Sequence, residues 1–291
     1  MRRSYATECQ AKLARFRSWI FPNRSCSRIQ LGTSRHGTPG CPFGALHYNL
    51  GTMSIASNLA EIRERIERAA RHAGRDPRDI ALMAVSKTHP ASAILEAISA
   101  GQALFGENKV QEFAGKRDAV LAASKAGTFH LIGHLQSNKA ARAVELFDAV
   151  DSVDSLRLAE RLNEAAAHLH RKPDVLIEIN VGGEEAKSGL DPKSDELLAL
   201  LDAQARLANL VIRGFMTVPP FTEDPQGARG CFAQLRELRD RMSARSGLAL
   251  GELSMGMSHD FEVAIEEGST CVRVGTAIFG ARSYPAQEVK L

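Results

Sequence analysis

Residues 80–90 read IALMAVSKTHP, an apolar run that ends in a serine and a lysine. A short apolar run bounded by polar residues and a proline is typical of a strand that is buried on both faces. A doubly wound open sheet normally carries a glycine-rich turn directly after its first strand, but here that position holds Ser86, Lys87 and Thr88. The stretch therefore predicts a parallel strand and favours a barrel over an open sheet.

Short apolar runs and helix-like stretches alternate along the chain from residue 55 onward. An amphipathic helix is predicted first, because Ile55, Leu59, Ile62 and Ile66 recur with a period of about 3.6 residues. Eight strands are predicted after it, at Ile80–Ser86, Ala103–Gly106, Phe129–Gly133, Ala149–Val153, Val175–Val181, Val211–Met216, Glu252–Met255 and Cys271–Val274. Parallel strands need helical crossovers, and eight such units close into a (β/α)8 barrel. We predict an α/β fold with a single-domain TIM barrel; a doubly wound sheet is the alternative.

The first 52 residues differ in composition from the rest of the chain. Eight of the 37 Lys and Arg lie there against one of the 34 acids, which leaves the remaining residues with a net charge of −4. An Arg-rich and Ser-rich leader that is broken by Gly and Pro does not predict a folded core. It is either an organelle transit peptide or the product of an upstream start codon, with Met53 as the natural first residue. We divide the chain into a leader at 1–52 and a barrel domain at 53–291.

Composition argues against several classes of protein. The acidic balance of residues 53–291 makes a general nucleic-acid role unexpected, and no uncharged apolar stretch is long enough to span a membrane. Cys231 and Cys271 have no redox or metal-ligand spacing, so we expect a reducing compartment without disulfides. The histidines match no compact ligand motif, and no metal is expected. The predicted location is the cytoplasm, or an organelle if the leader is a transit peptide.

Two charged side chains stand at the ends of predicted strands, where a barrel forms its active site. Lys87 ends the first apolar run, and apolar surroundings would favour the neutral amine that a Schiff base requires. The simpler interpretation is a lysine whose ammonium group reaches water. Arg273 interrupts the last strand, and a buried cation needs a partner. The simpler interpretation there is a structural salt bridge with an acid such as Glu178.

Glycines and hydroxyl groups follow the last two predicted strands. Gly256, Met257 and Ser258 follow the seventh strand, and Gly275 and Thr276 follow the eighth. Glycine permits close backbone approach, and hydroxyls together with backbone N–H groups suit phosphate oxygens. Barrels often bind phosphate with the loops after strands seven and eight, so this joint placement predicts a phosphate site.

Five blocks of sequence have a common counterpart in one known family. They are AVSKT at 84–88, FGEN at 105–108, HLIGHLQSNK at 130–139, SMGMSHD at 254–260 and VRVGTAIFG at 272–280. In order and spacing they resemble the pyridoxal phosphate homeostasis protein family, also called the YggS or proline synthase co-transcribed family. The leader has no counterpart in the family pattern, which supports Met53 as the first residue.

This resemblance implies a barrel like the N-terminal domain of alanine racemase, with pyridoxal 5′-phosphate (PLP) as its cofactor. It implies that Lys87 forms a Schiff base, that Arg273 faces the pyridine nitrogen and that Asn108 packs near the ring. It also implies a phosphate site formed by Met257, Ser258, Gly275 and Thr276. Lys109 departs from the tyrosine of some members, so no role is assigned to that position.

The resemblance further implies a protein of vitamin B6 homeostasis that stores or delivers PLP, and not an enzyme. A single-domain PLP-dependent amino-acid racemase is the alternative, and a phosphosugar lyase on the same barrel is a third hypothesis. An arginine against the pyridine nitrogen disfavours protonation of the ring and weakens it as an electron sink. The expected partners are PLP and PLP-dependent apoenzymes, and the expected state is a monomer.

A racemase would need an acid or base opposite the lysine. Tyr5 and Tyr48 lie in the leader, and Tyr284 lies in the tail after the last predicted strand. His134 or Cys271 could serve in principle. The sequence therefore favours the binding protein over the enzyme.

Overall fold

The computed structural model describes residues 54–184 and 188–280, and within them eight parallel strands form a closed barrel in chain order. The strands are β1 (Ala81–Val85), β2 (Leu104–Glu107), β3 (Thr128–Leu131), β4 (Ala149–Val153), β5 (Asp174–Glu178), β6 (Val211–Met216), β7 (Glu252–Met257) and β8 (Cys271–Val274). The barrel closes because β1 pairs with β8 as well as with β2. The predicted (β/α)8 barrel is confirmed.

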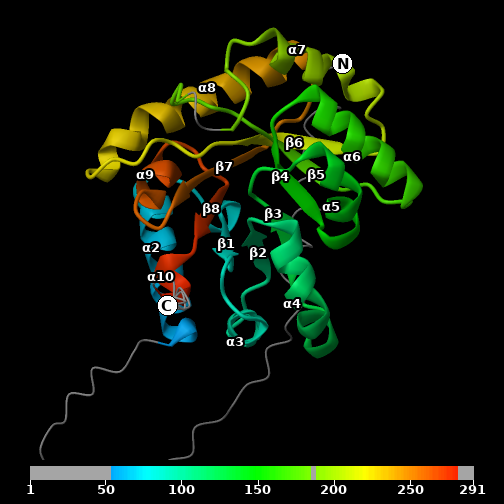
Figure 1. Ribbon diagram of the computed structural model, residues 1–291. Coiled ribbons are helices and arrows are strands. Elements are labelled where there is room, and N and C mark those ends of the chain that lie inside the picture. The colour runs from blue at the N-terminus through cyan, green and yellow to red at the C-terminus, as the bar shows by residue number, and fades with distance from the viewer. Residues whose placement is uncertain (1–53, 185–187, 281–291) are drawn as a thin grey trace, which may run out of the picture. The chain divides into compact units, whose positions relative to one another are not determined.

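Helices form an outer layer around the strands (Figure 1). They are α2 (Ile55–His72), α3 (Ala91–Ser99), α4 (Val110–Ala123), α5 (Ala140–Leu146), α6 (Leu156–His168), α7 (Asp195–Asp202), α8 (Arg229–Ser246), α9 (Phe261–Glu266) and α10 (Thr276–Phe279). Most strand side chains that face these helices are apolar, and Glu107 of β2, which pairs with Lys116 of α4, is an exception. Phe105 of β2 and Phe129 of β3, for example, stack with ring centroids 5.4 Å apart and meet Phe113 of α4. No helix of the described residues has the length and apolar character that crossing a bilayer requires.

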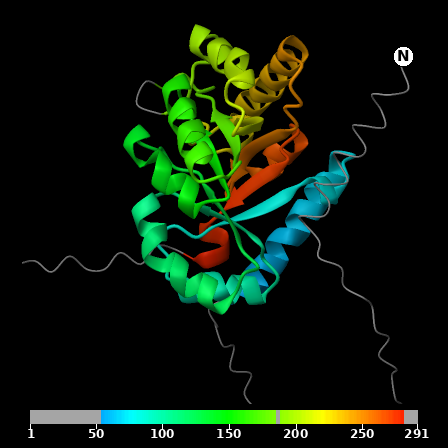
Figure 2. The same cartoon turned by 90° about the vertical axis from the view of Figure 1, so that its right-hand side faces the viewer.

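The amphipathic helix predicted at the start of the barrel domain is α2. Ser54 caps it by accepting a hydrogen bond from the backbone N–H of Ser57 (3.2 Å), and Leu59, Ile62 and Ile66 are buried as its period requires. The helix packs against α9 and α10, and α2 and α10 lie side by side in both ribbon views (Figure 2). The predicted leader and the proposed start at Met53 lie outside the described residues.

The predicted strands agree with the observed ones in number and order, and their bounds differ by a few residues. The difference that matters most for the site concerns Glu107. The apolar pattern places this residue after the second strand. It is instead the last residue of β2 and is fully buried. A charged residue can end a buried strand when a partner compensates its charge, which the sequence pattern does not reveal.

Strands β6 and β7 approach so closely at one point that only glycine fits. Gly214 of β6 lies opposite Glu252 of β7, and a Cβ atom built on Gly214 would lie 1.9 Å from the Glu252 carbonyl oxygen. A contact this short between side chain and backbone cannot be relieved by a rotamer change. Gly214 therefore sets the spacing of the two strands.

Ionisable groups line the inside of the barrel near the amino ends of the strands. His130 Nδ1 lies 3.0 Å from Asp151 Oδ1. Burial lowers the pKa of His130, but the carboxylates of Asp151, Glu252 and Asp148 together more than offset this, and the pKa lies above its usual value. Burial, followed by the charge of Asp151, raises the pKa of Glu252 to about 7, while His130 opposes this rise. Asp174 and Arg213, which pair at 3.0 Å, act on Glu252 in opposite directions.

The raised pKa of Glu252 makes the stability of the barrel depend on pH. The folded state binds this proton more tightly than the unfolded state does, so the contribution is complete below the unfolded pKa and is lost as pH rises through about 7. We expect Glu252→Gln to raise the free energy of unfolding at pH 8 by about 1–3 kcal/mol and to change it little at pH 4.5. Urea denaturation at the two pH values measures this.

Asp118→Asn is the matched control, because its side chain is 97% exposed and should change stability little at either pH. A Glu252→Gln effect of equal size at both pH values would contradict the assignment.

Candidate functional site

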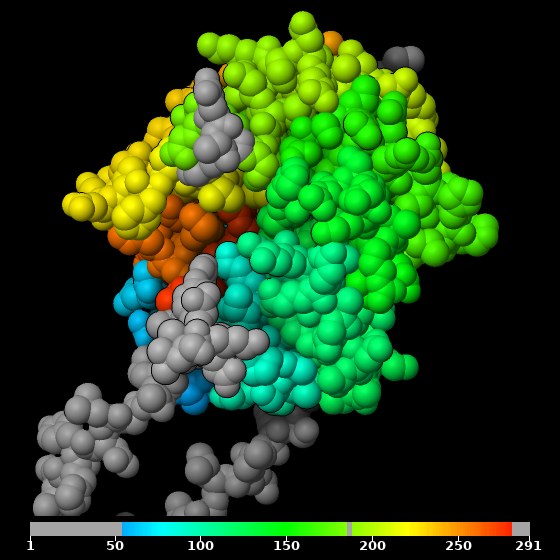
Figure 3. Space-filling model, in the orientation of Figure 1, coloured from blue at the N-terminus to red at the C-terminus, as the bar shows by residue number. Residues whose placement is uncertain are grey.

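Barrel closure brings the first and last strands together, and with them the residues predicted to form the site. Ala84 of β1 pairs with Val274 of β8, so Lys87 and Gly275 follow neighbouring strands. A Cβ atom on Gly275 would lie 3.2 Å from the Val85 carbonyl oxygen, which shows how closely the two segments approach. Red atoms of the β8–α10 segment lie recessed between cyan atoms of the β1–β2 region and orange atoms of the β7–α9 region (Figure 3).

The loops after β7 and β8 meet through a direct hydrogen bond. The backbone N–H of Gly275 donates to Ser258 Oγ at 3.4 Å. Gly256 adopts a left-handed φ of +93°, and a Cβ there would lie 2.6 Å from the Ala264 Cβ. Gly256 and Met257 belong to β7 and do not follow it as expected, and glycine is required at this irregular end of the strand, just before Ser258. Thr276, the first residue of α10, is exposed beside this contact.

Met257 is placed differently from the expectation for a phosphate ligand. Its backbone N–H donates to Asp260 Oδ1 at 2.6 Å, and its carbonyl accepts the Asp260 N–H at 3.1 Å. The backbone donor predicted for an anion is thus already used within the loop. Of the predicted phosphate ligands, Thr276 is exposed at the mouth, whereas Met257, Ser258 and Gly275 are partly buried.

Arg273 is buried, with 4% of its surface exposed, and points into the barrel. Its Nη1–H donates to Ser254 Oγ at 2.7 Å and its Nη2–H donates to the Thr217 carbonyl oxygen at 2.8 Å. Among the described residues no salt bridge joins it to Glu178, so the simpler interpretation from sequence is wrong. Glu178 lies near enough for Arg273 to lower its pKa, although burial raises that pKa more. Two neutral oxygens therefore hold a buried cation.

Asn108 lies at the same end of the barrel and is partly buried. The loop that follows β3 presses against its backbone, because a Cβ on Gly133 would lie 2.4 Å from the Asn108 carbonyl oxygen. This contact fixes the backbone of Asn108. Lys109, the next residue, is exposed and precedes α4.

A buried network beneath Lys87 was not predicted from the sequence. Ser86 Oγ donates to Glu107 Oε1 at 2.5 Å, and Lys116 Nζ of α4 lies 2.8 Å from the same oxygen. Burial raises the pKa of Glu107, and Lys116 opposes this rise. The sequence contains one signal for this network: Lys116 occupies a buried row of α4 that is otherwise apolar, with Val110, Phe113 and Val120. Lys87 itself is partly exposed.

The two side chains considered as an acid or base lie at opposite ends of the barrel. Cys271 opens β8 at its amino end and pairs with Ala81 at the start of β1, so it lies at the opposite end of the barrel from Lys87. Burial raises the pKa of its thiol. His134 follows β3 at the mouth, and its Nδ1 lies 2.9 Å from Asp154 Oδ2.

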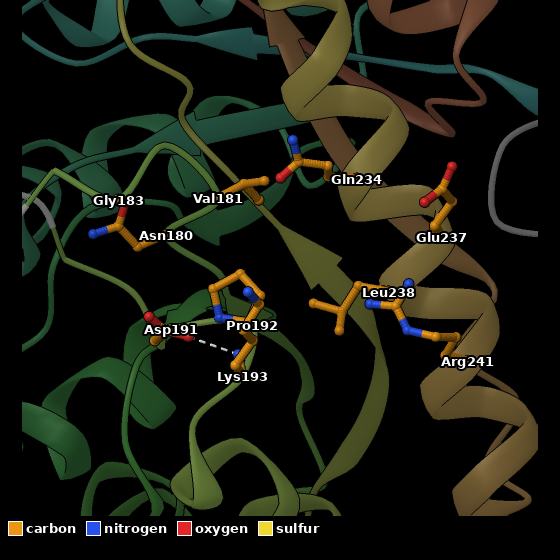
Figure 4. A pocket seen from close by; sticks show the side chains of 10 residues that line it. All are labelled: Asn180, Val181, Gly183, Asp191, Pro192, Lys193, Gln234, Glu237, Leu238 and Arg241. Carbon is orange, nitrogen blue, oxygen red and sulfur yellow. Dashed lines mark hydrogen bonds between the residues drawn. The ribbon is translucent and has the colours of Figure 1, made fainter.

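A hollow of about 290 Å³ lies away from the predicted residues, between α8 and the segment after β5 (Figure 4). Val181 and Pro192 face Gln234 and Leu238 of α8 across it, and the charged side chains lie toward its edges. None of the predicted site residues lines it. Across the described part of the chain, no group of three or more His, Cys, Asp or Glu side chains is arranged to hold a metal ion.

Comparison with known proteins agrees with this geometry. The family model for the alanine racemase N-terminal domain matches residues 57–283. The pyridoxal phosphate homeostasis protein of Pseudomonas aeruginosa is 46% identical over 233 residues, which cover 80% of this chain and 98% of that protein. The chain belongs to the pyridoxal phosphate homeostasis protein family. The resemblance recognised in the sequence blocks is thereby confirmed.

Solved structures extend the comparison. PipY of Synechococcus elongatus PCC7942, solved with PLP bound, is 41% identical with a TM-score of 0.69, covering 78% of this chain and all of that one. Alanine racemase of Corynebacterium glutamicum is 19% identical with a TM-score of 0.57, covering 80% of this chain and 64% of that one. At that identity the racemase shows the fold alone. The family member thus keeps the racemase barrel, while the roles of its individual site residues stay predictions.

Ser254 should stabilise the family member through the buried guanidinium of Arg273. We expect Ser254→Ala to lower the free energy of unfolding by about 1.5–3 kcal/mol, because a buried charged donor loses its acceptor. Urea denaturation measures the change. Ser99→Ala is the control, since that hydroxyl is exposed and bonds only within its own helix. A loss no larger than the control's would mean that the hydrogen bond to Arg273 contributes little.

Proposed function

We propose that this protein binds PLP at the mouth of its barrel, holds it through a reversible covalent bond to Lys87, and serves PLP homeostasis. The observation that carries the proposal is the convergence of Lys87, Arg273 and the Ser258–Gly275 contact at the barrel mouth in a chain that belongs to this family. A relative of known structure, PipY, was solved with PLP bound.

The residues present fit the anionic end of PLP. Ser258 and Gly275 are already in contact, and a Cβ atom at position 275 would fit only tightly, because it would lie 3.2 Å from the Val85 carbonyl oxygen. Hydroxyl groups and backbone N–H groups are the donors that phosphate oxygens accept. Ser258, Gly275 and Thr276 would hold the phosphate and thereby fix the position of the ring.

The residues also fit a neutral pyridine nitrogen. Arg273 is a permanent cation that two neutral oxygens hold, and five N–H groups make it a donor only. A ring nitrogen with a free lone pair is a suitable additional acceptor, whereas a protonated nitrogen would place two cations together. Arg273 would thus keep the ring unprotonated.

PLP supplies an aldehyde, which condenses with a primary amine to form a C=N bond and releases one molecule of water. Lys87 offers that amine from the end of β1, beside the loop that would hold the phosphate. Because the condensation is reversible, the same lysine can release the cofactor to another amine. PLP-dependent apoenzymes are the recipients that this chemistry suits.

We further propose that binding, without turnover, is the main activity. The names of the relatives, which are homeostasis proteins, support this. Of the two side chains considered as an acid or base, Cys271 lies at the far end of the barrel from Lys87, whereas His134 lies at the mouth and pairs with Asp154. A racemase assay with L- and D-alanine tests it. Turnover that is clearly above background and is abolished by Lys87→Ala would overturn this part of the proposal.

Covalent attachment should depend on one lysine. Wild-type protein mixed with PLP should absorb at about 420 nm, and borohydride should fix the label on Lys87. Lys87→Ala should lose both signals because the amine is gone. Lys139→Ala, which changes another lysine at the same end of the barrel, is the control and should keep them. Peptide mass spectrometry locates the label, and a label on Lys109 or Lys139 would refute the assignment.

Retention of PLP should depend on the two hydroxyl groups at the mouth. We expect Ser258→Ala combined with Thr276→Val to weaken retention by about tenfold or more, because hydrogen bonds to a charged phosphate contribute about 1.5–3 kcal/mol each. Dialysis followed by absorbance measures the remaining cofactor. Retention equal to that of the wild type would contradict the phosphate site.

A further inference from the structure

The turn that carries Lys87 is held from below by a single buried ammonium group. Lys116 Nζ donates to the Ser86 carbonyl oxygen at 3.0 Å and to the His89 carbonyl oxygen at 3.1 Å. The side chain of Lys116 is only 10% exposed. One cation therefore fixes the residue before Lys87 and the residue two positions after it.

Two carboxylates complete the arrangement. Glu107 Oε1 accepts from Ser86 Oγ at 2.5 Å and pairs with Lys116 at 2.8 Å. Glu112 Oε1 accepts the Thr88 backbone N–H at 2.5 Å and pairs with Lys116 at 3.2 Å. Ser86, Thr88 and His89 are thus each tied to β2 or α4, on both sides of Lys87.

Thr88 adopts an unusual backbone conformation within this turn. Its φ is +66°, in the left-handed region that costs a non-glycine residue about 1 kcal/mol or more. The hydrogen bond from its N–H to Glu112 supports that conformation. Strained residues that surrounding contacts maintain are concentrated at functional sites, and this one is adjacent to Lys87.

Packing alone gives no reason for a lysine at position 116. Its row on α4 is otherwise apolar, and apolar residues of similar volume often match or exceed a buried ion pair in stability. What an apolar residue would not supply is the set of donors that hold Ser86 and His89. The charge therefore acts on the geometry of the turn.

We propose that Lys116, together with Glu107 and Glu112, positions Lys87 so that its amine is directed toward the PLP aldehyde. These are positioning residues, which act through the backbone of residues 86–89 and do not touch the cofactor. The inference rests on the proposed function, in which Lys87 bonds to PLP. It predicts that loosening the turn slows covalent attachment and leaves the non-covalent binding of the phosphate unchanged.

Glu112→Ala is the decisive variant, because Glu112 is partly exposed and its loss leaves the Lys116–Glu107 pair in place. We expect the rate of attachment, followed by absorbance at about 420 nm after mixing with PLP, to fall about tenfold or more. Glu112→Gln keeps an oxygen acceptor for the Thr88 N–H and should restore the rate to within about twofold of wild type. Asp118→Ala, on the same helix and exposed, is the control.

A second ligand separates positioning from general damage. Pyridoxine 5′-phosphate has the ring and phosphate but no aldehyde, so it cannot bond to Lys87. Its Kd for Glu112→Ala should stay within about twofold of wild type, as should the midpoint of urea denaturation. If Glu112→Ala weakened the binding of pyridoxine 5′-phosphate as much as it slowed the attachment of PLP, the network would only stabilise the fold, and the inference would be overturned.

The two proposals fail in distinguishable ways. If wild-type protein never attaches PLP, the proposed function and the inference fall together. If the wild type attaches PLP and Glu112→Ala attaches it at the same rate, only the inference is wrong. Lys116→Met extends the test. In the folded fraction of this variant, attachment should be slower than in Glu112→Ala, because the donors to Ser86 and His89 are lost.

Discussion

The pairing of β1 with β8 is the constraint on which the remaining structure depends. It closes the barrel, sets Met83 opposite Arg273, and so places the segment after the first strand beside the segment after the last. Without that pairing, the covalent end and the phosphate end of the proposed site would not lie side by side. A parallel barrel thereby joins groups that lie near opposite ends of the sequence, with helices between all the intervening strands.

Two buried cations of the barrel, Arg273 and Lys116, have different roles. Arg273 is held by neutral oxygens of β6–β7 and keeps its charge available to the inside of the barrel. Lys116 lies outside the strands, where carboxylates and carbonyl oxygens compensate it, and its charge orders a turn. The difference follows from the hydrogen-bond partners. Acids bond directly to Lys116 and compensate its charge, whereas Arg273 bonds to neutral oxygens and interacts with Glu178 without a direct ion pair, so it can still stabilise a lone pair.

The sequence predicts the fold well because its signals are local. Each signal is contained in a short stretch of sequence. Examples are the apolar run at 81–85, the helical periodicity in 55–66, and the glycine and hydroxyl residues near the ends of the last strands. The polar network is a different case. Glu107, Lys116, Thr217 and Ser254 acquire their roles from partners on other elements, and no local pattern encodes those pairings. The simpler interpretation of Arg273, a salt bridge with an acid such as Glu178, failed for the same reason, since charge alone does not show that the neutral oxygens of Thr217 and Ser254 accept its hydrogen bonds.

The tight crossing at Gly214 has a consequence for the interpretation of inherited variants. An alanine there would force β6 away from β7, and these are the strands that lead into Thr217 and Ser254, the two anchors of Arg273. A missense change that adds one methyl group, remote in sequence from every residue of the mouth, would thus misplace the buried guanidinium. A substitution at Gly214 can therefore disturb the proposed cofactor site, although this residue is not among those expected to contact the cofactor.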